Sequence, residues 1–395
     1  MNTSRLPIDD PTTGEGPLDL EAELVARAAC VGPILASNAA RHDREGTWVG
    51  ESFEAVRAAG LLSIAVPREL GGDGASIRQV AMVQLALGRF DGSTALASAM
   101  HQHVTAFTAW RYRRDLPGAA ATLRRVVEEG FVLASTGGGD YTHPAGSASK
   151  VDGGYRVNGH KSFVSQAPVG SAMSTMFTYD DPERGRRVLN MSVPFASPGV
   201  EIVENWDTHG MRGTASHDVL FDDVLVTDDR VLADRPHGVL DPPLQVISSI
   251  AFPIISAVYL GVAEGAYDHV IRVFGARATD QSVQRRIGLM SHSLRVARWA
   301  LDGALASVGD DPAPSMSTVA AVMAAKREIA LAAHEVCDLA VQLVGAAAFR
   351  RGTPLERAIR DVRAAAFHPL DPERTLIHAG RHALGLSADR PDEWA

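Results

Sequence analysis

The chain has 395 residues, of which 46% are hydrophobic and 22% are charged, with a formal net charge of −9 and a pI of about 5.9. This composition allows a large buried core in two or three structural units, and it excludes the basic surface expected of a nucleic-acid-binding protein. We find neither the run of about 18–20 apolar residues that a membrane span requires nor a signal peptide. We therefore expect a cytoplasmic protein that binds neither nucleic acid nor membrane.

The N-terminal part of the chain is expected to be helical after a short tail. Residues 1–17 are acidic and rich in proline and glycine, which is typical of a disordered tail. From residue 18 to 130, apolar residues recur at the spacing of helices, so we expect an N-terminal helical domain there. One of its helices carries His101 and His103, which stand two positions apart, so at most one of them faces a given side.

Between residues 131 and 234 the pattern changes to short apolar runs separated by turn residues. This pattern is typical of a small all-β domain, either a barrel or a sandwich. The pair Asn158-Gly159 is a signal for a two-residue hairpin turn. Residues 219–221 and 224–226 are expected to form two further strands.

Helical patterns return in the last part of the chain, residues 235–395. Four long apolar patterns cover about 244–276, 281–307, 316–347 and 353–384. Four neighbouring helices of this length predict a helical bundle. The chain as a whole is therefore expected to be α+β, with an N-terminal helical domain, a middle β domain and a C-terminal four-helix bundle.

Two cysteines, Cys30 and Cys337, each fall within an apolar helical pattern. Buried free thiols are therefore expected at both positions, and no disulfide or metal pair. No metal site is expected elsewhere in the chain.

The most specific motif lies near the C-terminus, where residues 352–381 read GTPLERAIRDVRAAAFHPLDPERTLIHAGR. Its G-x-P-x-E-R start and the R-D-x-R that follows resemble the closing signature of acyl-CoA dehydrogenases. In that family a tyrosine and the catalytic glutamate come next, where this chain has His368 and Pro369. Together with the helical, β and helical order of the chain, the resemblance covers about residues 20–384. It implies a flavin-dependent oxidoreductase that forms a homodimer or homotetramer.

The resemblance also implies contacts to the flavin ring from the middle domain. In the strand KSFVSQ, Phe163 takes the place of the aromatic residue that packs on the flavin, and Ser165 that of the hydroxyl near its reactive nitrogen. A flat apolar partner and a hydroxyl are what a flavin ring needs from its protein. Thr136 is implied at the flavin edge, where the glycines at 137–139 allow a close approach of the backbone.

Further cofactor contacts are implied in the bundle. Arg272 resembles the arginine of a family R-x-x-F-G motif that reaches the cofactor phosphates of a neighbouring subunit, although it is shifted by one residue, or about 100° on a helix. Gln342 and Gly345 resemble part of Q-x-x-G-G-x-G-Y, but Ala346 and Ala348 replace glycines that admit the adenine half of FAD. FAD is therefore the cofactor that the resemblance implies, with FMN or a loosely bound reduced flavin as the alternative.

The usual catalytic base of the family is missing. Pro369 occupies one position of the glutamate, and Ala251 occupies the position that some relatives use instead, whereas Glu264 is expected to be structural. His368 resembles a histidine of the flavin-dependent monooxygenases that share this fold, where it stabilises the oxygenated flavin. An imidazole can hydrogen-bond such a group or act as a base. His101 is the second catalytic candidate.

One turn is expected to border the substrate cavity. The sequence from 209 to 216, HGMRGTAS, resembles the Gly-Met-Arg turn of the family. Its Arg212 is a candidate for binding an anionic substrate, with a structural salt bridge as the alternative.

Three functions remain open at this point. The first, which His368 favours, is reduced-flavin-dependent monooxygenation of a small organic substrate, with a flavin reductase as partner. The second is an acyl-CoA or acyl-carrier-protein dehydrogenase with a relocated base, an acyl thioester as substrate and an electron-transfer flavoprotein as partner. The third is a flavin-binding protein without catalysis.

Overall fold

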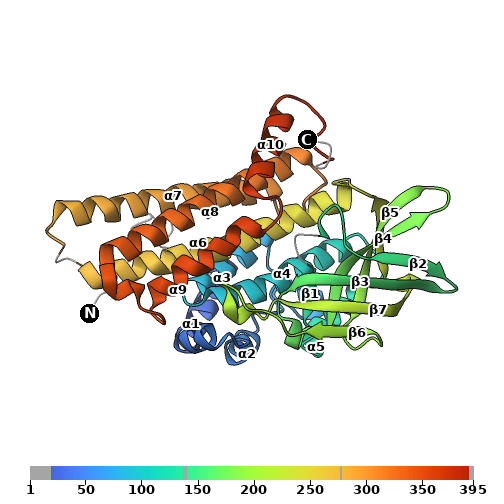
Figure 1. Ribbon diagram of the computed structural model, residues 1–395, viewed down its shortest axis with the longest axis horizontal. Coiled ribbons are helices and arrows are strands. Elements are labelled where there is room, and N and C mark those ends of the chain that lie inside the picture. The colour runs from blue at the N-terminus through green and yellow to red at the C-terminus, as the bar shows by residue number, and fades with distance from the viewer. Residues whose placement is uncertain (1–18, 137–139, 276–277, 391–395) are drawn as a thin grey trace.

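The computed structural model describes residues 19–136, 140–275 and 278–390. The predicted tail at 1–17 and the glycines at 137–139 lie outside these ranges. N-terminal helices, a β sheet and C-terminal helices follow one another along the chain and pack side by side (Figure 1). The predicted α+β fold with its three parts is confirmed.

The N-terminal helices bury one of their members almost completely. They are α1 (Leu20–Glu45), α2 (Gly50–Ala58), α3 (Ile77–Gly88), α4 (Gly92–Tyr112) and α5 (Ala119–Glu128). Ser76 and Gln79 form a capping box that starts α3, and the Asp91 side chain accepts a hydrogen bond from Thr94 N at the start of α4. Helix α4 packs against both α6 and β1, so it carries His101 and His103 into the interior.

The middle of the chain forms one sheet of eight strands. These are β1 (Leu133–Ser135), β2 (Ser147–Val151), β3 (Gly154–Val164), β4 (Ala172–Asp181), β5 (Gly185–Pro194), β6 (Val200–Val203), β7 (His217–Thr227) and β8 (Val231–Pro236). The strand order is β6-β7-β3-β2-β4-β5-β8, and β1 pairs in parallel with β4. Strand β1 therefore lies where the sheet meets α4.

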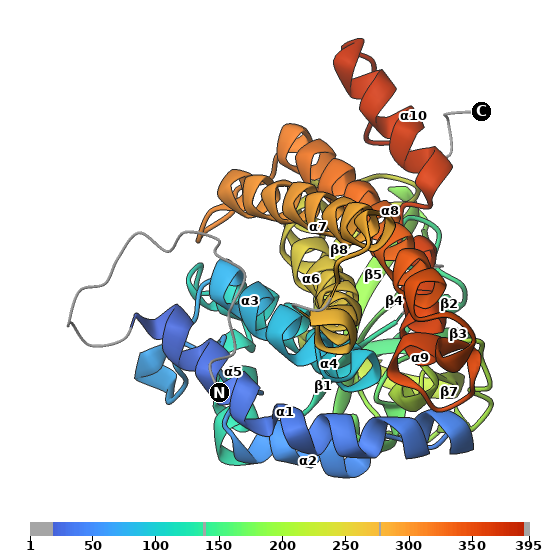
Figure 2. The same ribbon diagram turned by 90° about the vertical axis from the view of Figure 1, so that its left-hand side faces the viewer.

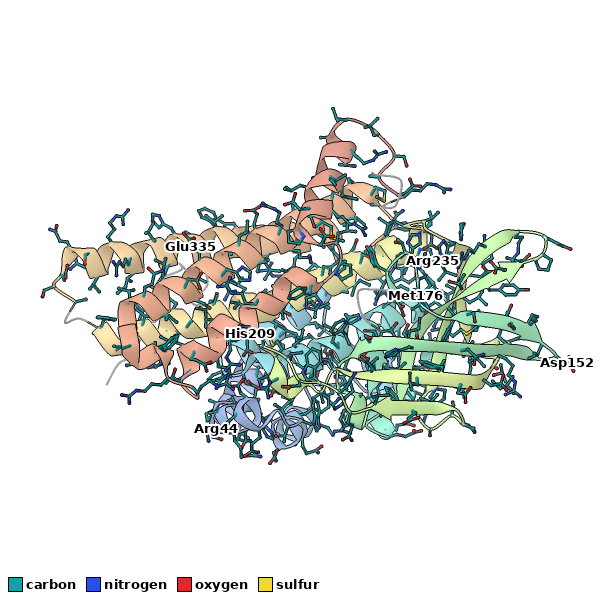
Figure 3. The ribbon with its side chains drawn as sticks, in the orientation of Figure 1. Arg44, Asp152, Met176, His209, Arg235 and Glu335 are labelled. Atoms are coloured by element: carbon teal, nitrogen blue, oxygen red, sulfur yellow. The ribbon has the colours of Figure 1, made fainter. Side chains whose placement is uncertain are left out.

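The predicted hairpin at Asn158-Gly159 is wrong, because both residues lie inside the continuous strand β3. The hairpin falls at Asp152 and Gly153, and Asp152 marks its tip in Figure 3. Gly159 is needed for another reason: a Cβ at this position would lie 3.0 Å from the Cα of Gly146. The glycine permits a close approach of two chain segments rather than a turn.

The two strands predicted at 219–221 and 224–226 are a single strand, β7. Asp223 adopts a positive φ of 49° within it, and its backbone N–H donates to the side-chain oxygen of Asn158, at 2.9 Å. The register between β3 and β7 shifts at the same place, between Val157 and Gly159. A bulge therefore replaces the predicted break.

The C-terminal helices are α6 (Pro242–Phe274), α7 (Gln281–Val308), α8 (Met316–Val344), α9 (Pro354–Asp361) and α10 (Pro372–Ala383). The predicted fourth helix is thus broken: a 3₁₀ segment over Val362–Phe367 follows α9, and His368 is extended, with ψ at 139°. Pro369 disfavours a helical residue before it and lacks a donor of its own. Asp371 then starts α10, which projects from the bundle (Figures 1 and 2). The break places His368 at a turn between two helices.

Two helical segments correct the expectation that no run is long and apolar enough to span a membrane. Pro242–Phe274 and Met316–Phe349 both are, by length and composition alone. The most apolar window of the first is 94% buried inside the protein, as in the core helix of a globular protein, whereas that of the second is 28% buried. Helix α6 is therefore the centre of the helical core, and α8 exposes an apolar face.

Of the two cysteines, only Cys337 is buried as predicted. Cys30 is exposed on α1, because it falls on the outward face of that helix. Both are free thiols.

Candidate active site

One wall of the candidate site is the end of strand β3. Phe163 adopts a left-handed conformation, with φ at 62°, and this turns its side chain outward, so that 60% of it is exposed. Its ring meets Trp206 edge-on, with 5.9 Å between the centroids. Ser165 is buried two residues on, and its hydroxyl is 2.8 Å from that of Ser216. The strand thus presents an apolar ring beside a small group of hydroxyls.

Thr136, directly after β1, has a buried hydroxyl that no described residue hydrogen-bonds. Its backbone N–H donates to Ser174 O at 3.3 Å, but no described residue hydrogen-bonds its Oγ1, which is buried. An unsatisfied buried hydroxyl costs about 1–3 kcal/mol. An outward aromatic ring and an orphaned hydroxyl fit the apolar face and polar edge of a flavin ring. The predicted contacts Thr136, Phe163 and Ser165 are therefore chemically suited to a flavin.

His368 lies in the helical bundle and lines a small cavity between α6, α8 and the 3₁₀ segment after α9. The Nε2 atom of His368 is 2.7 Å from the hydroxyl of Tyr259, a fully buried residue of α6. Lys326 of α8 lines the same small cavity, and its Nζ donates to Leu370 O at 2.7 Å. The cavity has a volume of about 10 Å³, which is enough for about one water molecule. Tyr259 and Lys326 are site residues that the sequence analysis missed.

The contact with Tyr259 determines which nitrogen of His368 carries the proton. The Tyr259 hydroxyl has no other recorded acceptor among the described residues, so it donates to Nε2. The neutral imidazole then carries its proton on Nδ1, for which no hydrogen bond to a described residue is recorded. His368 therefore keeps one donor, Nδ1–H, that no described residue accepts.

The surroundings of His368 keep it neutral. Burial lowers its pKa to about 3, and the positive charges of Lys326 and His103 act in the same direction. Burial also lowers the pKa of Lys326 to about 8, against the opposing effect of Asp371. At neutral pH the ring is therefore uncharged, with one N–H that can donate a hydrogen bond and one nitrogen that can accept one.

No carboxylate replaces the missing base among the residues placed near His368. Ala251 is buried on α6. Glu264, farther along the same helix, accepts two hydrogen bonds from Arg298, at 2.6 and 2.9 Å, so it is structural as expected. The polar side chains that line its cavity are those of Tyr259, Lys326 and Ser256, and the imidazole of His103 also affects its pKa.

The other predicted catalytic residue, His101, lies in the core and binds backbone with both ring nitrogens. Its Nδ1 accepts from Leu133 N at 3.0 Å, and its Nε2 donates to Leu62 O at 2.9 Å. Burial lowers its pKa to about 4. His101 thus joins α4 to β1 and to the loop after α2. Its proposed role in catalysis stays a prediction, and the structure gives it a structural task.

His103, rather than His101, faces the side on which the candidate site lies. Its Nδ1 donates to Ala99 O at 3.0 Å, and its Nε2 is 3.3 Å from the Ser135 hydroxyl. It lies close enough to His368 to affect that residue's pKa. Helix α4 and strand β1 therefore close the site from behind.

A buried lysine and a buried arginine fix the loop that leads from β1 to β2. Lys161 forms an ion pair with Asp140, at 2.8 Å, and also donates to Ala145 O. Arg235 donates to Tyr141 O at 2.9 Å and lies against Met176, where the sheet meets the bundle (Figure 3). Since Tyr141 packs edge-on against Phe252 of the His368 cavity, the loop forms part of the site wall.

Arg212, predicted to border the substrate, is bound entirely by protein groups. Its Nε donates to Asp43 O at 2.8 Å, and one terminal nitrogen donates to Asp207 at 2.6 Å and to Thr208 O at 2.8 Å. These contacts tie the turn before β7 to α1. These contacts agree with the alternative interpretation, in which Arg212 forms a structural salt bridge. Its role in binding an anionic substrate stays a prediction.

The remaining predicted cofactor residues lie elsewhere in the chain. Arg272, Gln342 and Gly345 stand at the ends of α6 and α8 that point away from the sheet (Figure 1). Gln342 is exposed, and Gly345 has a φ of 73° with open space beside it. The structure does not bring these three residues together with Phe163 in one chain.

An exposed aromatic ring and a buried hydroxyl on the sheet, with a neutral histidine on the bundle, are groups that fit a flavin oxidoreductase. The chain matches the acyl-CoA dehydrogenase N-terminal domain over residues 26–112, the middle domain over 134–224 and the C-terminal domain over 253–368. It therefore belongs to the acyl-CoA dehydrogenase superfamily and is a flavin-dependent oxidoreductase.

Similar proteins within this superfamily are named after different reactions. RubN8, an amino sugar nitrososynthase of Streptomyces rubradiris, is 30% identical over 388 residues, which cover 90% of this chain and 88% of its own. YdbM of Bacillus subtilis, provisionally named an acyl-CoA dehydrogenase, is 29% identical over 379 residues, with 89% and 94% covered. The solved structure of KijD3 with FMN and a dTDP-linked amino keto sugar is 28% identical, has a TM-score of 0.87 and covers 96% of this chain and 98% of its own.

Proposed function

We propose that this protein is a reduced-flavin-dependent monooxygenase that transfers oxygen to the nitrogen of a small amine. The observation that carries the proposal is His368: a neutral imidazole lies directly before Pro369, which occupies the position where a dehydrogenase has its catalytic glutamate. An amino sugar nitrososynthase among the relatives supports nitrogen as the acceptor atom.

The protein's own residues have separate tasks in this reaction. When bound, the reduced flavin supplies the two electrons that activate dioxygen. Phe163 and Thr136 orient the ring, and Tyr259 holds His368 so that its Nδ1–H donates to the oxygen that is transferred. One oxygen atom goes to the substrate nitrogen, and the other leaves as water. The buried side chains around His368 exclude bulk water and so protect the activated oxygen.

FMN is the flavin that we propose. The alanines at 346 and 348 stand where glycines admit an adenine group, and a solved relative was obtained with FMN. A flavin that is used in its reduced form must be supplied by a separate reductase, so a flavin reductase is the proposed protein partner. A cytoplasmic location suits such a pair, and it stays a proposal.

The proposed oligomer is a homodimer or homotetramer, built through the exposed side of the bundle. Val296 and Trp299 of α7 and Leu331 of α8 are large apolar side chains that face solvent in the single chain, and Trp299 is 64% exposed. Apolar clusters of this kind mark contacts between subunits. Light scattering of the purified protein measures the oligomer, and a Trp299→Lys variant should shift it toward the monomer.

An acyl-CoA dehydrogenase remains the second candidate, because YdbM is nearly as similar. One experiment separates the two functions. Protein with bound FMN or FAD is mixed without oxygen with acyl-CoA thioesters of several chain lengths, and the flavin absorbance is followed. The proposal predicts no bleaching by any thioester, but amine oxidation in air when a reductase supplies reduced FMN. Bleaching by a thioester, with no oxidation of amines in air, would show that the dehydrogenase is correct.

A further inference from the structure

A second cavity lies farther along α6, toward its C-terminal end, and is lined by residues of α1, α3, α6 and α9, which Figure 2 shows on the near side of the molecule. Its volume is about 680 Å³, and it shares no lining residue with the His368 cavity. Most of its wall is small and apolar, with alanines from α1 and glycines from α3 and α6, among them Ala29, Ala36, Gly88 and Gly265. Ligand cavities in proteins measure about 300–1,000 Å³, so this one has room for a small organic molecule.

Arg357 lines this cavity and lacks a close partner. Its exposed fraction is only 9%, yet its guanidinium forms no hydrogen bond and no ion pair within 4 Å with any described residue. Arg357 does act on the charge of Asp361, one helical turn on, but Asp361 Oδ1 already accepts from Met211 N at 2.6 Å. Arg360 of the same helix forms a sharp contrast, because it donates to both Glu356 and Asp43. A buried guanidinium without a paired anion is costly.

A second arginine lines the same cavity from α6. Arg272 also has no recorded hydrogen bond or ion pair with a described residue, and it is exposed at the end of its helix. The third lining arginine, Arg89, is paired with Asp268. Burial raises the pKa of Asp361 to about 7, against the effect of Arg357, so this carboxyl carries only part of its charge near neutral pH. Two unpaired positive charges therefore line a cavity whose walls are otherwise mostly apolar.

We propose that this cavity binds a small organic anion, whose carboxylate or phosphate is held by Arg357 and Arg272 and whose apolar body packs on the alanine and glycine wall. Guanidinium groups bind both kinds of oxyanion through paired hydrogen bonds. Arg272 stands one residue away from the position of the arginine in the family motif. This shift agrees with the proposal, because Arg272 lines the cavity that α1 borders, whereas Gln342 does not line it. The proposal does not depend on the oxygenation reaction.

The test measures binding of three matched probes to the full-length protein by titration calorimetry. Naphthalene-2-carboxylate and 2-naphthyl phosphate represent the two anions, and 2-naphthalenemethanol is the neutral control. We expect at least one anion to bind at one site per chain, at least tenfold more tightly than the alcohol. The anion that binds more tightly shows whether the natural ligand carries a carboxylate or a phosphate. Equal affinity for all three, or displacement of the bound anion by FMN, would overturn the proposal.

Variants locate the site. Arg357→Gln and Arg272→Gln should each weaken anion binding at least tenfold and leave the alcohol unaffected, whereas Arg357→Lys should keep part of the affinity. Arg363→Gln is the matched control, because Arg363 is an exposed arginine near the end of α9 that is paired with Asp338. Arg272 is exposed, so its variant tests the site even where Arg357→Gln fails to fold. Unchanged binding in the Arg272 and Arg357→Lys variants, or equal loss in Arg363→Gln, would contradict the assignment.

Discussion

Helix α4 and the turn after α9 both present a histidine that sequence reasoning assigned to catalysis, and they use it differently. His101 binds a backbone N–H with one ring nitrogen and a backbone carbonyl with the other, so its hydrogen-bonding capacity is consumed by the fold. His368 receives one hydrogen bond, from a phenol, and keeps Nδ1–H available. The number of ring nitrogens left free, rather than burial alone, separates a structural histidine from one that can act on a substrate.

The largest expected effect is the loss of catalysis on changing His368 to alanine. General acid–base groups contribute about 10²–10⁴-fold to rates, so kcat for amine oxidation with excess reduced FMN should fall at least 100-fold. The variant also leaves the buried Tyr259 hydroxyl without its acceptor, which costs about 1–3 kcal/mol of stability, so the rate is measured per folded molecule. If the variant keeps its rate within about threefold of the wild type, His368 has no catalytic part and the contrast between the two histidines disappears.

Changing His101 to alanine should instead lower stability. The variant leaves Leu133 N–H and Leu62 C=O unpaired in the core, and each such group costs about 1–3 kcal/mol. We expect the free energy of unfolding, measured in urea, to fall by about 2–4 kcal/mol. His101→Gln, which keeps a donor and an acceptor, should recover part of this. A normal stability together with a 100-fold slower rate per folded molecule would reverse the roles assigned to the two histidines.

A smaller effect is expected for Tyr259→Phe. Loss of the phenol leaves His368 Nε2 without its donor, so the imidazole divides between its two neutral forms. We expect kcat to fall about 5- to 30-fold, as for the loss of one hydrogen bond of about 1–2 kcal/mol. Nitrogen NMR of labelled protein should show a single tautomer of His368 in the wild type and a mixture in the variant. A wild-type protein protonated at Nε2 would refute the assignment.

The last expected effect, which leaves the chain unaltered, is a dependence of stability on pH. Burial lowers the pKa of His101 and of His103 to about 4, and that of His368 to about 3. The unfolded chain then binds more protons below its ordinary histidine pKa of about 6.5, so stability is complete above that pH and falls as the pH drops toward 4. Urea unfolding at pH 7 and pH 5.5 should show this decline, and His101→Gln should reduce it. A flat profile would mean that these imidazoles are not held neutral.

The fold and the motif at 352–381 could be predicted from the sequence because each depends on local patterns. Apolar periodicity located the helices, and the match around His368 identified the family and supplied the candidate site, which stays a prediction. The errors arose where contacts distant in sequence decide the outcome. Gly159 serves a close approach to Gly146 rather than a turn, and the fourth helix of the bundle breaks before Pro369.

The partners of His368 could not be predicted for the same reason. Tyr259 lies 109 residues before His368 and is one of many buried residues of α6, so nothing in its local pattern marks it. Lys326 is a polar residue within an apolar helix, and this was the one available signal. The tasks of His101 and Arg212 depend on backbone groups of distant segments, which a sequence does not reveal.

Isotope labelling tests the central claim most directly. The purified protein is supplied with a primary amine, reduced FMN from a flavin reductase and dioxygen of the heavy oxygen isotope, and the product is examined by mass spectrometry. The account predicts a nitrogen-oxidised product that carries labelled oxygen, in the wild type but not in the His368→Ala variant. Release of hydrogen peroxide alone, with no labelled oxygen in any amine or other small substrate, would contradict it.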